Sequence, residues 1–275
     1  MHFTRGKSAL VRATALAYRR LKYAVAAPVV SGIMAYTPWL DGGDAPPKAL
    51  NYAADGDFVA QGDELIETLK RDFTLDGGTR ILDIGSGIGR VATGLYRAKC
   101  DVRYWGFDIV KYGVLWCKKK IPESEGYHFT HADIFNPFYN PRGKVDPCGY
   151  VFPYADNSFD LLIAVSVYTH LLEQETRAYF AQSMRVMDKG GKAYFTTFLV
   201  DDAIPPAAHF AFEHQIGAAY VERIEEPEMA VGFTRAFWDA LAAENGARIA
   251  KVNRGSWRGE AGMGDYQDCL IFEKV

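Results

Sequence analysis

Three glycines at alternate positions, Gly85, Gly87 and Gly89, directly follow a short apolar run. Glycine lets the backbone enter left-handed conformations and approach a ligand closely. A helical pattern begins straight after them, so a polar or anionic group of the ligand would meet a helix N-terminus. Asp83 lies just before the first glycine, and Arg90 stands where a dinucleotide fingerprint needs its last glycine. The sequence therefore predicts a ligand-binding strand, turn and helix.

Acidic residues end the next two apolar runs. Asp108 comes 23 residues after Gly85, a position from which a carboxylate accepts hydrogen bonds from both hydroxyls of a ribose. Asp133 ends the following run, in the string His-Ala-Asp-Ile. We expect the change Asp108→Ala to weaken ligand binding and to leave the melting curve of the free protein nearly unchanged.

Two further segments follow in the same order as known motifs. Residues 152–160 read Phe-Pro-Tyr-Ala-Asp-Asn-Ser-Phe-Asp, and residues 187–192 read Met-Asp-Lys-Gly-Gly-Lys. With the glycine turn and the two acids, they resemble the motifs of class I S-adenosylmethionine (SAM) methyltransferases, including P-x-x-D-x-S-F-D and L-x-P-G-G with Lys189 in place of proline. The resemblance covers roughly residues 60–200, and its five motifs together identify the chain as a member of that family.

The resemblance implies an α/β, Rossmann-like fold with a seven-stranded, mostly parallel sheet, an antiparallel last strand and helices on both faces. It also implies SAM as cofactor and S-adenosyl-L-homocysteine as product. The switch-point rule for open sheets independently predicts a ligand at the carboxyl ends of the first strands. The residues expected to hold the cofactor are Asp83, Gly85, Ser86, Gly87, Gly89, Arg90, Asp108, Ile109, Asp133, Ile134 and Ser166.

Candidate catalytic residues follow the fourth apolar run, where the chain reads Ser-Val-Tyr-Thr-His-Leu. His170 is the leading candidate for a base, because a hydroxyl acceptor must lose a proton and imidazole titrates near neutral pH; alternatively it caps a helix or binds backbone. Tyr168 is expected to shape the methyl pocket or to lie in the core, and Asp268 is the next candidate base. Residues 136–139 imitate the N-P-P-Y box of amino-methyltransferases, but they follow the third strand, which disfavours N-methylation of adenine or glutamine.

The acceptor is predicted to be a small-molecule or glycosidic hydroxyl. Residues 254–257 and 264–268 should border the ligand edge, where a Trp, an amide and carboxylates suit a sugar-like acceptor, although an ordinary polar hairpin is an equal alternative. Residues 200–233 are predicted to form a substrate lid, and its two histidines, at positions 209 and 214, face either the lid or solvent.

Three strings in this chain resemble bacterial methyltransferases of polysaccharide and glycolipid assembly: S-V-x-T-H, Tyr-Asn-Pro-Arg-Gly (139–143) and the terminal Tyr-Gln-Asp. Two alternatives stay open. One is methylation of a quinone or another lipid-like phenol at a membrane surface. The other is a scaffold protein that binds SAM without catalysis.

Strand and helix patterns alternate from residue 80 onward, which is typical of a mostly parallel sheet covered by helices. The expected strands are 80–84, 102–107, 127–131, 161–167, 192–198, 247–253 and 268–273. The expected helices are 89–98, 111–120, 173–187 and 235–245. The last two strands leave no room for a helix between them and should pair as a hairpin. We assign residues 1–50 to a helical extension with a linker and residues 51–275 to the methyltransferase domain.

The net charge of −3 conceals a strong asymmetry. Residues 1–40 contain six basic residues and no acid, so the remainder holds 25 basic residues against 34 acidic ones. An acidic body argues against nucleic acid as a partner. The four cysteines are scattered without a C-x-x-C spacing, which predicts free thiols and no metal site.

Residues 1–25 are predicted to form an amphipathic helix with Leu10, Ala17, Leu21 and Ala24 on one face. This helix would pack on the domain as a lid or make peripheral contact with an anionic membrane. The apolar run 23–36 is too short to span a bilayer and contains Pro28, so we expect a cytoplasmic protein.

Overall fold

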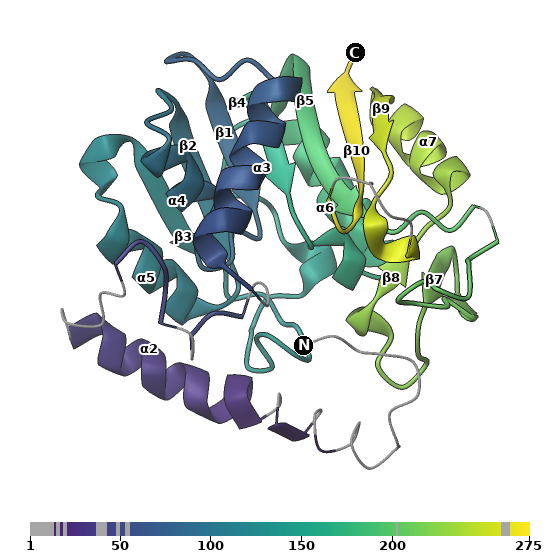
Figure 1. The fold of residues 1–275 in the computed structure, drawn as a ribbon, viewed down its shortest axis with the longest axis horizontal. Helices are drawn as coiled ribbons and strands as arrows, with labels where there is room; N and C mark the ends of the chain where they lie inside the picture. Colours follow the sequence, from purple (N-terminus) through teal and green to yellow (C-terminus); the bar gives the residue numbers. More distant parts are fainter. Residues whose placement is uncertain are drawn as a thin grey trace. The chain divides into compact units, whose positions relative to one another are not determined.

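The computed structural model contains one mixed sheet of seven strands, six parallel and the last of the chain antiparallel, with helices around it (Figure 1). In spatial order the strands are β3 (Tyr127–His131), β2 (Arg103–Asp108), β1 (Arg80–Ile84), β4 (Phe159–Ala164), β5 (Met187–Thr197), β10 (Asp268–Lys274) and β9 (Ala247–Asn253). The structure describes residues 14, 17–18, 21–36, 43–47, 50–52, 56–201, 203–259 and 265–275. The predicted Rossmann-like fold class is confirmed.

The described chain divides into two compact units, one ending at Asp146 and the other running from Pro147 to Val275. This division falls inside the segment that the sequence assigned to the methyltransferase domain. The boundary predicted near residue 50 stays a prediction, and the two units are described separately below.

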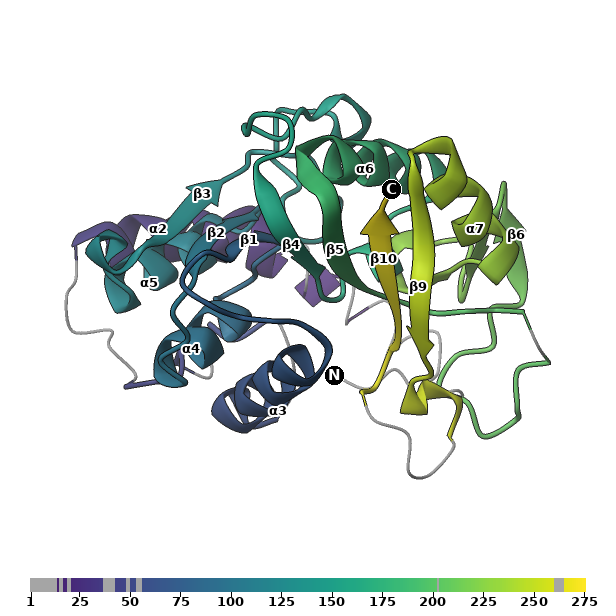
Figure 2. The same ribbon diagram turned by 90° about the horizontal axis from the view of Figure 1, so that it is seen from above.

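In the first unit, β3, β2 and β1 pair in parallel. Ile81, Leu82 and Ile84 are completely buried, as expected of a parallel strand covered on both faces. Among the described residues of this unit, four α-helices accompany these strands: α2 (Ala27–Tyr36), α3 (Phe58–Asp72), α4 (Arg90–Arg97) and α5 (Lys111–Lys120). Asp57 begins α3 by accepting hydrogen bonds from the backbone N–H groups of Val59 and Ala60. Helix α3 packs on α4 (Figure 2), and α2 packs on α5.

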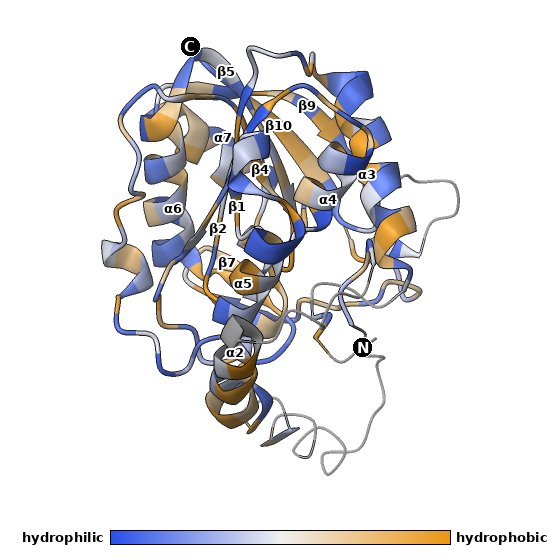
Figure 3. Cartoon of the chain, turned by 90° about the vertical axis from the view of Figure 1, so that its left-hand side faces the viewer, coloured by the Kyte–Doolittle hydropathy of each residue, from blue (hydrophilic) through white to orange (hydrophobic). Residues whose placement is uncertain are grey.

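In the second unit, β10 lies between β5 and β9 and is antiparallel to both, so Leu270 is opposite Phe195 on one side and Val252 on the other. The predicted terminal hairpin is therefore confirmed. Helices α6 (Glu173–Val186) and α7 (Arg235–Glu244) belong to this unit. In Figure 3 the turns of α3 and α6 alternate between hydrophobic and hydrophilic colours, as expected of helices with one buried face.

The edges of β4 and β5 differ from the prediction. Strand β5 begins at Met187 instead of residue 192, because Met187 pairs with Phe159 and the next four residues form a bulge before Lys192 pairs with Leu161. Strand β4 ends at Ala164 instead of residue 167, since Ser166 adopts a left-handed backbone with φ +59°.

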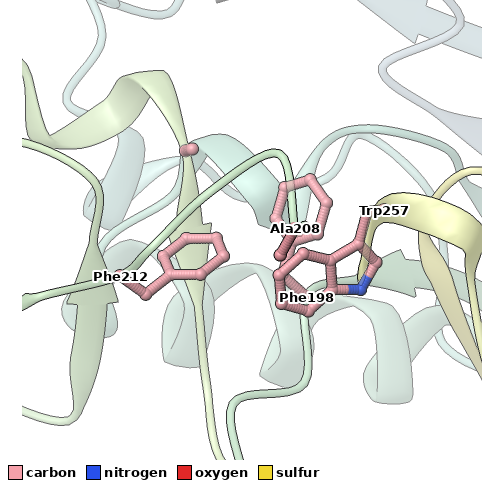
Figure 4. Close-up of a cluster of buried hydrophobic side chains, with 5 residues drawn as sticks. Phe198, Ala208, Phe212 and Trp257 are labelled. Carbon is pink, nitrogen blue, oxygen red and sulfur yellow. The ribbon is translucent and has the colours of Figure 1, made fainter. Parts of the chain in front are cut away.

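Residues 200–233, predicted as a substrate lid, contain a small antiparallel sheet of β6 (His214–Ile216), β7 (Ala219–Val221) and β8 (Val231–Gly232). Phe198, Ala208, Phe212, Ala230 and Trp257 form a buried cluster beside this sheet (Figure 4). The insertion thus shares a hydrophobic cluster with Phe198 and Trp257, two residues of the second unit that lie outside it. Its role as a lid stays a prediction.

Most of the helix predicted over residues 1–25 lies outside the described residues. Leu21 is helical, and a π-helical segment, Lys22–Ala26, leads into α2. In the part of the chain that the structure describes, no helix has the length and apolar character to cross a membrane.

Candidate active site

The glycine turn between β1 and α4 is built on left-handed backbone. Gly85, Gly87 and Gly89 have φ angles of +68°, +61° and +82°. A side chain at these positions would strain the turn, because L-residues other than glycine pay to adopt such angles. At Gly89 a Cβ atom would also lie 2.6 Å from the Sγ atom of Cys117. The alternate spacing read from the sequence therefore has a direct backbone cause.

Asp108, at the end of β2, ties this turn to the neighbouring strand. Its Oδ2 accepts a hydrogen bond from the N–H of Gly87 (2.8 Å). Its Oδ1 accepts from the N–H of Val110 (2.7 Å) and from the hydroxyl of Tyr52 (3.0 Å). Burial raises the pKa of the Asp108 carboxyl, while the two N–H groups favour its ionised form. The carboxylate thus has a structural role before any ligand is considered.

Tyr52 lies against the same turn, although no motif or periodicity in the sequence marks this residue. A Cβ atom built on Gly113 would be 2.5 Å from the Tyr52 hydroxyl and 2.8 Å from the carbonyl oxygen of Gly87. Burial, followed by the nearby Asp108 carboxylate, raises the pKa of Tyr52 well above its ordinary value. Tyr52 therefore stays protonated and acts as a hydrogen-bond donor.

Asp83, inside β1, is buried and accepts a hydrogen bond from the hydroxyl of Tyr104 (2.6 Å). Burial raises its pKa to about 7, although the bond from Tyr104 and the positive charge of Arg90 both favour ionisation. The guanidinium of Arg90 also lies 3.5 Å from the side-chain oxygen of Gln61 on α3. In the chain, Asp83 precedes the turn and Arg90 follows it.

Asp133 and Ile134 follow β3, and Asn140 holds this corner by donating to the Oδ1 of Asp133 (3.2 Å) and to the carbonyl of Ile134 (2.9 Å). Ile134 is buried and Ile109 is half-buried. The side chain of Asn136 accepts from the N–H groups of the residues at 138 and 139. The segment that imitates an N-P-P-Y box is thus a hydrogen-bonded turn in this structure.

His170 lies in the second unit, in a single 3₁₀ turn (Tyr168–His170) after β4. Its Nδ1 is 2.8 Å from the carbonyl oxygen of Glu228, a residue of the insertion. A carbonyl only accepts, so Nδ1 carries a proton and the lone pair of the neutral ring is on Nε2. The backbone contact raised as an alternative is therefore present, and it orients the ring.

Tyr168 and Asp268 occupy interior positions. Tyr168 is completely buried and packs against Phe195 and Trp238. Asp268 is also completely buried, and its carboxylate accepts from three N–H groups: those of Leu199 (2.8 Å) and Gly255 (3.0 Å) and the indole of Trp257 (2.7 Å). This geometry suits a core residue for Tyr168 and a positioning residue for Asp268.

A polar cluster joins β4, β5 and the start of β10. The Oε1 of Gln267 accepts from the hydroxyls of Ser166 (3.0 Å) and Thr196 (2.6 Å), and its Nε2 lies 3.5 Å from the hydroxyl of Thr169. The N–H of Ser166 donates to Thr196 (2.8 Å), which holds the left-handed backbone in place. Ser166 was predicted as a cofactor residue, whereas Thr196 was missed because a buried threonine in an apolar strand carries no distinguishing pattern.

The two histidines of the insertion differ in their contacts. The Nδ1 of His209 is 2.9 Å from the hydroxyl of Tyr266, in the segment predicted to border the acceptor. His214 is exposed on β6. Trp257, expected on the same border, is completely buried in the cluster of Figure 4.

Residues 82–195 match a protein family described as "Methyltransferase domain". The match contains the glycine turn, Asp108, Asp133 and His170, and ends within β5. Residues 82–195 therefore carry a SAM-dependent methyltransferase domain.

Solved structures with the same fold include three methyltransferases of low sequence identity. A SAM-dependent methyltransferase from Methanosarcina mazei has 16% identity and a TM-score of 0.51, over 76% of this chain and 97% of that one. The magnesium protoporphyrin IX methyltransferase of Synechocystis PCC 6803, solved with SAH, has 16% identity and a TM-score of 0.51, over 81% and 90%. The 1,6-didemethyltoxoflavin-N1-methyltransferase of Burkholderia thailandensis, solved with S-adenosylhomocysteine, has 14% identity and a TM-score of 0.50, over 80% of each chain.

The glycine turn of this methyltransferase fits the cofactor. The hydroxyl of Ser86 is buried and has no hydrogen-bond partner among the residues that the structure describes. A buried hydroxyl without a partner is costly, and a polar ligand at the turn would satisfy it. Gly106 on the adjacent strand β2 lets the turn pack closely against that strand. A Cβ atom at position 106 would lie only 2.9 Å from the Cβ of Ser86.

Proposed function

We propose that this methyltransferase transfers the methyl group of SAM to a hydroxyl of a small-molecule or glycosidic acceptor, with His170 as the base. The observation that carries the proposal is the bond between the Nδ1 of His170 and the carbonyl oxygen of Glu228 (2.8 Å). In a neutral ring this bond leaves the lone pair on Nε2, from which the imidazole would accept the proton of a hydroxyl.

Donor recognition is assigned to the first unit. The backbone of the turn would hold the polar end of the cofactor through Gly85, Ser86, Gly87 and Gly89. The carboxylate of Asp108 would accept hydrogen bonds from the ribose hydroxyls. The adenine ring of the cofactor would contact Asp133, Ile109 and Ile134. The turn itself is supported by Asp83 and Arg90. When bound, SAM supplies an activated methyl group on a sulfonium centre, so positioning provides much of the rate.

Acceptor recognition is assigned to the second unit. The half-buried amide of Gln267, with the completely buried Thr169 beside it, suits hydrogen bonding to a polyol. Ser166, predicted to hold the cofactor, bonds to the same amide. The left-handed backbone of Ser166, a residue other than glycine, is strained, and such strain is concentrated at functional sites. A glycosidic acceptor, as in enzymes of polysaccharide and glycolipid assembly, is the class we favour.

The experiment compares His170→Gln and His170→Ala with the wild type and with His128→Gln. His128 is a matched control, because it lies on β3 and pairs with Glu123 in the first unit. Both variants at position 170 should lower turnover by roughly 10²–10⁴-fold with SAM affinity retained, and the control should keep its rate. Full activity of His170→Ala would contradict the assignment of the base.

A lipid-like phenol is a second candidate acceptor, and one observation favours it. Apolar side chains between residues 18 and 33 are exposed on the first unit, as described below. An enzyme that works beside a membrane has access to quinone-type acceptors. Rates measured on a soluble glycoside and on a phenol carried in vesicles distinguish the two candidates.

A further inference from the structure

Five large apolar side chains near the N-terminus are exposed at helical spacing. Tyr18, Leu21, Val25, Val29 and Ile33 have exposed fractions of 61%, 61%, 50%, 58% and 49%. Residues three and four positions apart share one face of a helix, so these side chains form a continuous outward face, here called the apolar face. Soluble proteins seldom expose apolar groups in such a row without a partner for it.

The opposite side of this helix is fixed by packing. Tyr23 is only 7% exposed. Its ring lies edge-on to those of Tyr139 and Tyr52, with distances of 5.3 Å and 6.3 Å between the ring centroids. Helix α2 packs on α5, and Ser31 is buried. Figure 3 shows hydrophobic colour along α2 at the outside of this unit. The apolar face therefore points outward because the other side is held on the domain.

Charge indicates what the apolar face meets. All six charged residues within positions 1–40 are basic: Arg5, Lys7, Arg12, Arg19, Arg20 and Lys22. Acidic phospholipids attract basic segments next to an apolar helix face. A second copy of the chain is disfavoured as partner, because it would bring two segments of charge +6 together.

We infer that the apolar face and the basic segment before it bind the surface of an anionic phospholipid membrane. The helix lies in the interface and does not cross the bilayer. Its inner side contacts Tyr52, which donates to Asp108, so the membrane-bound helix is joined through two tyrosines to the residue proposed for the ribose. Membrane binding itself does not depend on the proposed reaction.

The test uses the full chain and vesicles of phosphatidylcholine with or without phosphatidylglycerol. Sedimentation should show binding only when phosphatidylglycerol is present, and added salt should release the protein, since salt screens the attraction. The variant Leu21→Ser/Val25→Ser/Val29→Ser should bind at least about tenfold more weakly, because each lost side chain removes apolar area from the interface. A charge variant, Arg20→Glu/Lys22→Glu, should lose the preference for anionic vesicles.

The matched control is Val151→Ser/Ile224→Ser, at two apolar residues of the second unit that are 63% and 60% exposed. It should bind as the wild type does. Melting curves verify that each variant is folded. Equal sedimentation with neutral vesicles, or unchanged binding of the triple serine variant, would overturn the inference. A second pair of results would also overturn it: light scattering shows that the wild type is a dimer and the triple serine variant is a monomer, and no protein sediments with vesicles.

Discussion

Replacing Asp108 by alanine tests the cofactor site and the local fold together. The change removes the acceptor of three donors, the N–H groups of Gly87 and Val110 and the hydroxyl of Tyr52. A buried donor left without a partner costs about 1–3 kcal/mol. The two backbone groups alone therefore predict a loss of at least about 2 kcal/mol in the free energy of unfolding. At about 2–4 °C per kcal/mol, the melting temperature falls by roughly 4–8 °C.

This outcome differs from the sequence-based expectation that the melting curve stays nearly unchanged. We now expect a lower melting temperature, because the Asp108 carboxylate accepts hydrogen bonds from three donors of the protein in addition to those expected from the ribose. Loss of charge-assisted hydrogen bonds, worth roughly 1.5–3 kcal/mol each, should also weaken SAM binding at least about tenfold.

The assay combines thermal unfolding with calorimetric titration of SAM, well below the melting temperature of the variant. Tyr52→Phe is the matched control, because it removes one donor and keeps the carboxylate with its two N–H partners. Its melting temperature should change by less than half as much as that of Asp108→Ala. Wild-type SAM affinity in Asp108→Ala would refute the ribose assignment, and an unchanged melting temperature would refute the hydrogen-bond reasoning.

Three further predictions concern buried polar groups. Burial raises the pKa of Asp83 from an ordinary 3.8 to about 7 in the folded chain. The proton that the folded chain retains on Asp83 stabilises it fully below pH 4, and this stabilisation, up to about 4 kcal/mol in total, is lost as the pH rises through 7. Asp83→Asn should flatten the curve of unfolding free energy against pH in this range, and an unaltered slope in urea titrations would argue against the shift. Asp268→Asn should lower the free energy of unfolding by about 2–4 kcal/mol, since an amide nitrogen then faces N–H donors; a stable but inactive variant would return Asp268 to the candidate bases. Gln267→Leu should raise the KM for the acceptor and leave SAM affinity intact, and the reverse result would place Gln267 with the cofactor.

Local sequence patterns predicted the fold well because each element has a strong signal of its own. The strand Ala247–Asn253 and the helix Lys111–Lys120 were predicted to the residue. The left-handed turn from Gly85 to Gly89 was predictable, since glycine is the residue that adopts such backbone without strain. The bulge at the start of β5 was not, because it depends on pairing with Phe159 across the sheet.

The candidate site was less predictable, because its contacts join residues distant in the chain. Tyr52 meets Asp108 across 56 positions, and nothing in the surrounding sequence marks it. The sequence alone does not show whether Asp268 faces solvent or accepts from three buried N–H groups, and only the structure distinguishes these two environments. The partner of His170 is a backbone carbonyl, which every residue possesses.

The proposed O-methylation is tested by incubating the full chain with SAM and a panel of glycosides and phenols and by analysing the products with mass spectrometry. We expect S-adenosyl-L-homocysteine together with an acceptor that has gained one CH₂, located by fragmentation on an oxygen, and we expect His170→Ala to lose both products. Formation of neither product with any acceptor, despite SAM binding, or a methyl group placed on nitrogen or carbon, would contradict it.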